Sequence, residues 1–282
     1  CKENGKCKCL VASGCLAQRY REEILTLIPE LDGIIGINDC EQAVALVDSI
    51  LKGKEHVNLV TTEDKAVHTS DRILTTGGHY AYLKIAEGCD KRCTYCVIPS
   101  VRGAYRSVPM EELLEEARVL ADQGVKELIL VAQETTLYGT DIYGKKSLPA
   151  LLKELCKIDG IYWIRLLYCY PEEITEELVS TIASEPKICH YLDIPIQHGS
   201  DKILKRMGRR TDQQALRDKI AMIREYIPDI ALRTTLITGF PGETEEDHEI
   251  NMQFVDEMEF DRLGVFTYSR EEDTPAYKIE KT

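Results

Sequence analysis

The sequence predicts an α/β protein whose larger part is a partial (β/α)6 TIM-like barrel. Two observations carry this prediction. Short apolar stretches alternate with helical stretches from residue 80 to the C-terminus, which is typical of a parallel sheet with crossover helices. A polar or glycine-bearing segment follows each apolar stretch, as expected of loops at the C-terminal edge of such a sheet. Six β/α units fit a partial barrel better than a closed eight-stranded one, which needs about 250 residues.

A smaller α/β unit is predicted to precede the barrel, over residues 1–54. Its expected elements, in order, are a strand at 8–13, a helix at 16–28, a strand at 33–37 and a helix from about 38 to 52. Residues 55–78 are polar and have no regular pattern, so we expect a linker there. The barrel domain is then expected over 79–282.

The barrel strands are predicted from their apolar residues and from the breakers that follow them. They are expected at 81–86, 127–132, 163–168, 191–196, 231–237 and 263–268. The helix after the first strand is the best marked, with Pro109 in its first turn and Gly124 just past its end. The C-terminal ends of these strands are expected to form the active face.

The bulk composition limits the class of protein. Hydrophobic residues make up 44% and charged residues 29% of the 282 residues, which is ordinary for a globular chain. No apolar stretch approaches the roughly 20 residues that a membrane helix needs. The net charge of −13 disfavours tight binding to a phosphate backbone and favours a basic protein partner. The 11 cysteines cluster by motif, which predicts metal ligation in a reducing, cytoplasmic compartment.

Three cysteines in one loop are the strongest chemical signal. Cys89, Cys93 and Cys96 stand in the sequence GCDKRCTYC, directly after the first barrel strand. Thiolates at this CxxxCxxC spacing can bind three corners of a four-iron cluster and leave the fourth iron without a protein ligand. An iron with an open position is a place for chemistry, as the open position of a catalytic zinc is. The next cysteine, Cys156, is far away in sequence.

Two other interpretations of these cysteines stay open. A zinc site needs a fourth ligand, and His79 is the only close candidate. A buried group of structural cysteines is disfavoured by the charged residues between them, Asp90, Lys91 and Arg92. Ligand number and spacing favour the iron–sulfur cluster.

The segments after the other strands supply candidate ligand contacts at the same edge. Tyr95 in the cysteine loop can anchor the loop or place its ring against a purine base. Arg233 lies in an apolar strand and needs a carboxylate, from a ligand or from the protein. Gly239 allows close approach of the backbone to a ligand, and Glu243 can cap its turn or bind a ribose. The remaining polar candidates are Gln133, Gln197 and Ser200.

Taken together, these segments resemble the radical S-adenosylmethionine (SAM) enzymes, and within them the methylthiotransferase branch. The resemblance rests on GCLAQRY at 14–20, the cysteine loop, YLDIPIQHGSDKILKRMGRRT at 191–211, TGFPGET at 238–244 and YSREEDTPAY at 268–277. The segments EGCDKRCTYCVIPSVRGAYRS, AQETTLYGTD and LLYCYPEEI are most similar to the enzymes that modify an aspartate of a ribosomal protein. The related tRNA methylthiotransferases fit these three segments less well.

The resemblance implies three domains in a complete protein. A flavodoxin-like N-terminal domain supplies three cysteines to an auxiliary [4Fe–4S] cluster, a radical SAM domain follows, and a small β-rich TRAM domain comes last. Residues 1–54 would be the end of the first domain, and Cys15 matches its third auxiliary-cluster cysteine. Cys1, Cys7 and Cys9 do not match the other two cysteine motifs. The chain is therefore expected to be a fragment that lacks both outer parts.

The resemblance also implies cofactors, a reaction and partners. Cys89, Cys93 and Cys96 hold a [4Fe–4S] cluster whose open iron is chelated by SAM; the expected SAM contacts are Tyr95, Gln133, Gln197, Ser200, Arg233, Gly239 and Glu243. One SAM methylates sulfur at the auxiliary cluster, and another is cleaved to a 5′-deoxyadenosyl radical. This radical takes hydrogen from the β-carbon of an aspartate in a small-subunit ribosomal protein, and the methylthio group joins that carbon. A reducing electron carrier and a sulfur donor are the further partners.

Two other functions remain as alternatives. Methylthiolation of a tRNA adenosine predicts a basic path across the barrel mouth, for which the available residues are Arg102, Arg106, Lys205, Arg206, Arg209 and Arg210. A non-enzymatic iron–sulfur or zinc protein predicts a fully ligated metal and leaves the other strand-end segments without a role. The net charge of −13 favours a protein substrate over a nucleic acid.

Overall fold

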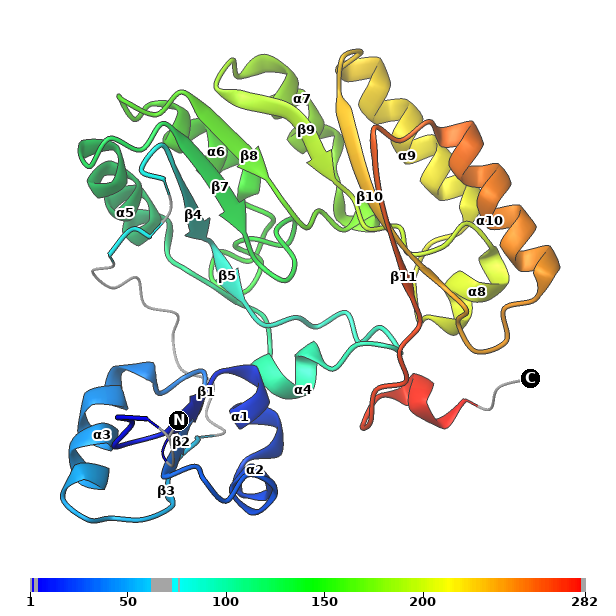
Figure 1. The fold of residues 1–282 in the computed structure, drawn as a ribbon. Helices are drawn as coiled ribbons and strands as arrows, with labels where there is room; N and C mark the ends of the chain where they lie inside the picture. The colour runs from blue at the N-terminus through cyan, green and yellow to red at the C-terminus, as the bar shows by residue number, and fades with distance from the viewer. Residues whose placement is uncertain (1, 3–4, 62–72, 76, 280–282) are drawn as a thin grey trace. The chain divides into compact units, whose positions relative to one another are not determined.

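The computed structural model describes residues 2, 5–61, 73–75 and 77–279 of the chain. The chain forms two compact units. The smaller unit consists of residues 1–66 and 98–104, and the larger unit of residues 67–97 and 105–282. Their helices and strands are labelled in Figure 1.

The smaller unit is a three-stranded parallel sheet with helices. Its strand order is β1-β2-β3, and the strands are β1 (Val11–Ser13), β2 (Gly33–Ile35) and β3 (Val57–Leu59). Its helical elements are α1 (Cys15–Tyr20), α2 (Glu22–Leu27), η1 (Cys40–Gln42), α3 (Ala43–Leu51) and α4 (Ile98–Arg102). Ala17, Ile24, Leu31 and Ile34 form one buried apolar cluster that joins the helices to the sheet.

Two features of this unit differ from the sequence prediction. The helix expected over 16–28 is divided at Arg21, whose φ of 46° separates α1 from α2. No regular element is predicted between 54 and 78, yet β3 lies there and pairs with β2. A three-residue strand is too short for periodicity to separate it from a loop. Residues 62–72 and 76 of the predicted linker lie outside the described residues.

The larger unit is a curved sheet of six parallel strands with helices on one side (Figure 1). Along the sheet the strands are β4 (Tyr80–Lys84), β7 (Glu127–Val131), β8 (Trp163–Leu166), β9 (Ile188–Asp193), β10 (Ala231–Thr238) and β11 (Arg262–Thr267). This order follows the chain and confirms the predicted partial (β/α)6 barrel. Of the six predicted strands, β9 is displaced most, because it begins pairing with β8 at Ile188 rather than at Tyr191.

Helices connect these strands by crossovers. The main ones are α5 (Met110–Asp122), α6 (Leu148–Cys156), α7 (Glu176–Ser184), α9 (Gln213–Tyr226) and α10 (Glu245–Met258). Shorter elements lie in the loops, namely the paired strands β5 (Ala86–Glu87) and β6 (Arg106–Ser107), the helix α8 (Asp201–Arg206), and the turns η2 (Pro171–Glu173) and η3 (Pro275–Lys278). Among the described residues, none of the helices has the length and apolar character needed to cross a membrane.

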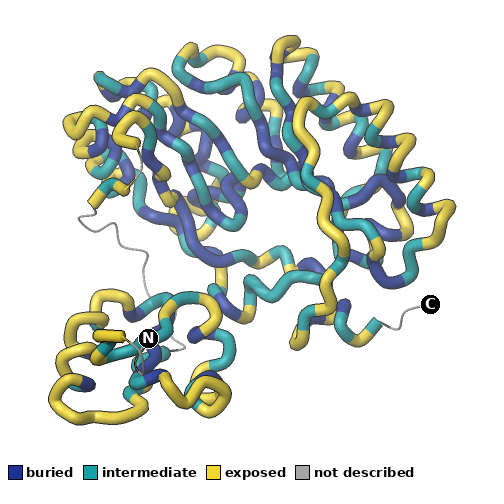
Figure 2. The backbone as a smooth tube through the Cα atoms, viewed as in Figure 1, coloured by how far each residue is buried: buried dark blue, intermediate teal, exposed yellow. Residues whose placement is uncertain are grey.

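Alternation along the strands separates a buried face from an inner face. In β4, Ala81 and Leu83 are buried in the main core, whereas Tyr82 between them is exposed. Ion pairs cross the inner face, with Arg165 bonded to Glu127 at 2.6 Å between β8 and β7. In the larger unit, Figure 2 shows exposed residues along the helices and along β11.

Asp247 joins the loop after β9 to the start of α10. Its carboxylate accepts hydrogen bonds from Ser200 Oγ at 2.8 Å, from Lys202 Nζ at 2.5 Å and from the Thr244 N–H at 3.0 Å. Thr244 in turn accepts from the Asp247 N–H, which completes a capping box. Burial opposes ionisation, but these hydrogen bonds outweigh it and hold the pKa of Asp247 well below its ordinary value of 3.8.

We predict that Asp247→Asn lowers the free energy of unfolding at neutral pH by about 2 kcal/mol, because hydrogen bonds to a charged group are strong. Since the folded pKa is depressed, this contribution is present above the unfolded pKa and is lost as the pH falls through the folded pKa. Urea unfolding should therefore show a smaller difference from wild type at about pH 3 than at neutral pH. The control is Glu246→Gln, an exposed neighbour. An effect as small as the control's would contradict the assignment.

Candidate functional site

The cysteine loop begins where the first strand reaches the C-terminal edge of the barrel. The chain leaves β4, forms β5, and reaches Gly88, whose φ of 79° is the left-handed conformation that glycine adopts easily. The Gly88 N–H donates to Gln133 Oε1 at 2.8 Å. Because Gln133 lies just past β7, the start of the loop is fixed to the end of the neighbouring strand.

The middle of the loop is held through Thr94. Its N–H donates to Met207 O at 2.9 Å, and its hydroxyl donates to Arg206 O at 2.8 Å. Its carbonyl accepts from the Ala276 N–H at 2.8 Å. Met207 follows α8, and Ala276 lies in η3 after the last strand. The loop that follows the first strand is therefore bound to segments that follow the fourth and sixth strands of the sheet.

The three cysteines lie in this anchored loop. Cys93 is buried, whereas Cys89 and Cys96 are half-buried, and the Cys96 N–H donates to Cys93 O at 3.0 Å in a tight turn. Burial raises the pKa of Cys89 to about 11. A hydrogen bond from the Lys91 backbone acts in the opposite direction, whereas the negative charges of Glu134, Cys93 and Cys96 raise this pKa further. All three thiols are therefore carried by one anchored loop.

The arrangement suits a cluster better than a single metal ion. A four-iron cluster takes each thiolate on a different iron, so the three sulfurs need not point at one ion. His79, the fourth ligand in the zinc alternative, precedes β4 and contacts Gly77 O at 3.2 Å. The cysteines follow the other end of this strand, about 16 Å away at 3.3 Å per residue. His79 is therefore not placed to complete a zinc site.

Two cations lie on the tyrosine ring that contacts Cys93. Tyr170 Oη is 3.3 Å from Cys93 Sγ. The Arg209 guanidinium lies 3.8 Å, and the Lys91 ammonium 4.4 Å, from the centroid of the Tyr170 ring. Arg209 is buried and pairs with Glu172 at 3.3 Å. Thiolates that bind iron are negatively charged, so cations held next to them fit the donor set of an iron–sulfur cluster.

Glu134 is a site residue that the sequence analysis did not single out. It is fully buried just past β7, and its Oε1 accepts from the Thr136 N–H at 2.9 Å. In the part of the chain that the structure describes, its Oε2 has no hydrogen-bond partner. Burial raises the pKa of Glu134 to about 7, although Thr136 and Lys91 oppose the rise. The signal in the sequence was an acidic residue directly after a buried strand.

Tyr95, in the cysteine loop, packs against the turn that follows β10. The rings of Tyr95 and Phe240 pack edge to face, with centroids 6.4 Å apart. Glu243 Oε2 accepts from the Phe240 N–H at 2.9 Å and so closes this turn. Gly239 has a φ of 71°, and a Cβ there would meet no described atom within 4 Å. These contacts agree with Tyr95 as a loop anchor and Glu243 as a turn cap, and the exposed backbone at Gly239 is open to a ligand.

The remaining predicted ligand contacts are engaged by protein groups. Arg233 pairs with Asp193 at 2.5 Å across β10 and β9, which supplies the carboxylate that its position requires. Ser200 donates to Asp247. Gln197 has a φ of 75°, and its N–H donates to Thr235 O at 2.9 Å. These three residues connect the loop after β9 to β10 and α10.

Cys15 lies in the smaller unit as the first residue of α1. Its thiol is exposed and accepts a hydrogen bond from Arg102 Nη2 at 2.9 Å. Arg102 ends α4, which belongs to the same unit. A guanidinium is thus placed against the sulfur that the sequence analysis assigns to an auxiliary cluster. Cys1 lies outside the described residues.

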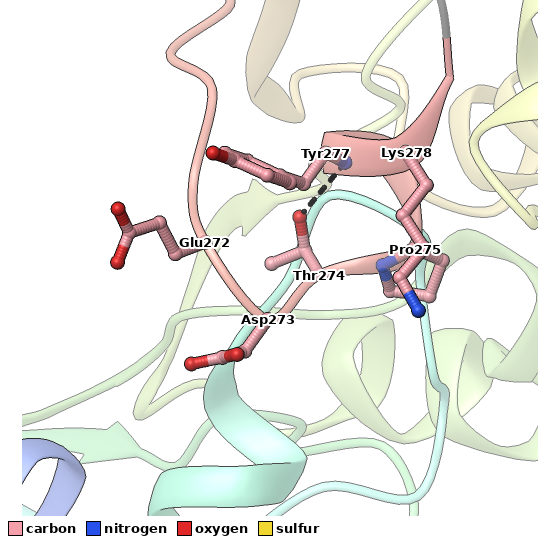
Figure 3. Close-up of a pocket in the computed structure, with 6 residues that line it drawn as sticks. All are labelled: Glu272, Asp273, Thr274, Pro275, Tyr277 and Lys278. Carbon is pink, nitrogen blue, oxygen red and sulfur yellow. Dashed lines mark hydrogen bonds between the residues drawn. The ribbon is translucent and has the colours of Figure 1, made fainter.

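A hollow is present in the segment that holds the loop (Figure 3). Its lining residues are Glu272, Asp273, Thr274, Pro275, Tyr277 and Lys278. Thr274 caps η3, since its hydroxyl accepts from the Tyr277 N–H at 3.3 Å. None of the three loop cysteines lines the hollow, so it is a surface feature beside the cysteine site.

Comparisons with known proteins agree with this arrangement. The family model of the radical SAM superfamily matches residues 83–255. The chain is 60% identical over 279 residues to "Ribosomal protein uS12 methylthiotransferase RimO" of Lachnoclostridium phytofermentans, covering 99% of this chain and 63% of that protein. It is 54% identical over 280 residues to the protein of the same name in Clostridium botulinum, with the same coverage. The chain thus spans about 63% of the length of these curated relatives.

Solved structures with low sequence identity share the fold. The cobalamin-dependent S-adenosylmethionine radical enzyme OxsB, with aqua-cobalamin and S-adenosylmethionine bound, matches with a TM-score of 0.66 at 14% identity, over 95% of this chain and 41% of that one. The radical S-adenosylmethionine methyltransferase TsrM of Kitasatospora setae, with cobalamin and a [4Fe-4S] cluster bound, matches with a TM-score of 0.58 at 20% identity, over 70% and 38% of the chains. These matches support the partial barrel alone.

We predict that Gly208→Ala loosens the cysteine loop. Gly208 has a φ of 73°, and a Cβ there would lie 3.3 Å from Thr94 Cγ2. Gly144→Ala is the matched control, because Gly144 has a φ of 69° and no described atom within 4 Å of such a Cβ. Both variants should lose about 1–2 kcal/mol of stability from the left-handed backbone. Only Gly208→Ala should also bind less iron and sulfide per chain after anaerobic reconstitution, and equal contents in the two variants would contradict the anchoring role.

Proposed function

We propose, since the chain belongs to the radical SAM superfamily, that it is the catalytic part of a methylthiotransferase. The proposed substrate is the ribosomal protein uS12, which would gain a methylthio group on the β-carbon of an aspartate. The observation that carries the proposal is the anchored loop of three cysteines at the C-terminal edge of the partial barrel. The choice of substrate is supported by 60% identity to a protein named as a uS12 methylthiotransferase.

Cys89, Cys93 and Cys96 are the proposed ligands of a [4Fe–4S] cluster. With SAM bound, such a cluster supplies radical chemistry that can take hydrogen from a carbon whose C–H bond is not acidic. Gln133 and Thr94 hold the loop so that the thiols keep their positions. The protein's own part is to exclude water and to fix the reacting groups relative to one another.

The surroundings of the loop suggest where SAM would be held. Glu134 is fully buried and adjoins Gln133, which holds the start of the cysteine loop, so we assign its carboxylate to a cationic group of the cofactor, such as the ammonium of SAM. Gly239 leaves its backbone open to a ligand, and Tyr95 offers an aromatic edge next to the same turn. The other proposed SAM contacts, Gln133, Gln197, Ser200, Arg233 and Glu243, would act mainly by holding the strand-end loops in place.

The smaller unit is proposed to be the end of a flavodoxin-like domain that holds an auxiliary [4Fe–4S] cluster. Cys15 would be one of its ligands, with Arg102 beside the sulfur. The reaction would need an electron carrier to reduce the cluster and a donor of sulfur. A ribosomal substrate would place the protein in the cytoplasm.

We predict that the reconstituted, reduced protein forms 5′-deoxyadenosine from SAM under anaerobic conditions. Cys93→Ala should abolish this product, because the cluster loses one of its three ligands. Cys156→Ala is the control, since this half-buried cysteine lies at the end of α6. Circular dichroism should show both variants folded. Retention of SAM cleavage in folded Cys93→Ala would disprove the cluster assignment.

The substrate is tested with the complete natural protein that carries this chain. Incubation with SAM, uS12 and, separately, tRNA should give a methylthio group on a uS12 aspartate, detected by peptide mass spectrometry. The acidic net charge of the chain and the burial of Arg209, one residue of the expected basic path, both favour uS12. Modification of tRNA without modification of uS12 would replace the proposed substrate.

A further inference from the structure

Tyr170 is placed to donate a hydrogen bond to the sulfur of Cys93. The two atoms, Tyr170 Oη and Cys93 Sγ, are 3.3 Å apart. In the free thiol either group can be the donor. When Cys93 binds iron, its sulfur has lost its proton, so only the Tyr170 hydroxyl can donate.

The ring of Tyr170 is fixed by two cations. Arg209 lies 3.8 Å from the ring centroid, and Lys91 lies 4.4 Å from it. Each cation has its own anchor, because Arg209 pairs with Glu172 at 3.3 Å and Lys91 pairs with Glu173. Arg209 is buried, with only 6% of its surface exposed, so its position is set by these contacts and not by solvent.

Both features act in the same direction on a cluster held by Cys93. Reduction adds one negative charge to the cluster. A hydrogen bond to a ligand sulfur and a buried positive charge nearby stabilise the more negative state, so both raise the reduction potential. The effect of Arg209 is strengthened by its burial, since a buried charge is poorly screened by solvent and salt.

We infer that Tyr170 tunes the reduction potential of the cluster, and that Arg209 is the positioning residue that holds Tyr170 against Cys93. This inference rests on the proposed cluster at Cys89, Cys93 and Cys96. Tyr170 thereby makes the cluster easier to reduce. The electron carrier that serves the reaction then needs less reducing power than a cluster without this hydrogen bond would require.

The test is an EPR-monitored redox titration of the reconstituted protein. Tyr170→Phe keeps the ring on which Arg209 and Lys91 stack and removes only the hydroxyl. At a fixed solution potential, the ratio of reduced to oxidised cluster should fall about tenfold, which is 59 mV for a one-electron couple. Tyr168→Phe is the matched control, because Tyr168 is exposed and lies two residues earlier in the same segment.

Arg209→Lys tests the positioning role. Lysine keeps a positive charge but lacks the planar guanidinium that lies on the ring. The potential should move in the same direction as in Tyr170→Phe. Combining the two substitutions should add little, because lysine keeps the positive charge and only the positioning of the Tyr170 hydroxyl is lost. A wild-type potential in Arg209→Lys, or full additivity of the two substitutions, would overturn the role of Arg209.

The inference and the proposed function fail in different ways. An unchanged potential in Tyr170→Phe, or an equal shift in Tyr168→Phe, overturns the tuning role whether or not SAM is cleaved. A cluster that titrates as expected in protein that does not cleave SAM supports the tuning role and contradicts the proposed function. Protein that assembles no cluster contradicts both.

Discussion

The hydrogen bonds of Thr94 are the constraint on which the site depends. A short loop that presents three thiols has little internal structure, so its shape must come from its neighbours. Thr94 binds it to the segments after β9 and β11, and Gly88 binds it to Gln133 after β7. The six strands therefore do more than form a core, because their C-terminal ends provide the partners that keep the thiols in place.

The charges around the loop are organised by the same geometry. Arg209 and Lys91 both stack on the ring of Tyr170, whose hydroxyl contacts Cys93. Each of these two cations forms an ion pair with a glutamate of η2. Buried ion pairs of this kind are costly unless both partners are well bonded. Their presence next to the thiols is understandable if the loop receives a negatively charged group. Glu134, one of whose oxygens has no hydrogen-bond partner among the described residues, leaves room for a positively charged group.

Much of this organisation could be predicted from the sequence, and the reasons are local. The CxxxCxxC spacing lies within one loop, and the strands are marked by apolar runs with breakers after them, so neither requires knowledge of distant contacts. The roles of Tyr170 and Arg209 could not be predicted, because Tyr170 contacts Cys93 from 77 residues away and Arg209 lies on the Tyr170 ring from another segment. The partner of Arg233 was left open for the same reason, and β3 was too short to recognise.

The most direct test of the account is the EPR spectrum of the reduced, reconstituted protein with and without SAM. Three cysteines are proposed to bind the cluster and to leave one iron open to SAM. We therefore predict the signal of a reduced [4Fe–4S] cluster whose spectrum changes when SAM is added, and loss of that change in Cys93→Ala. A cluster signal that is identical with and without SAM would contradict the open iron and, with it, the proposed chemistry.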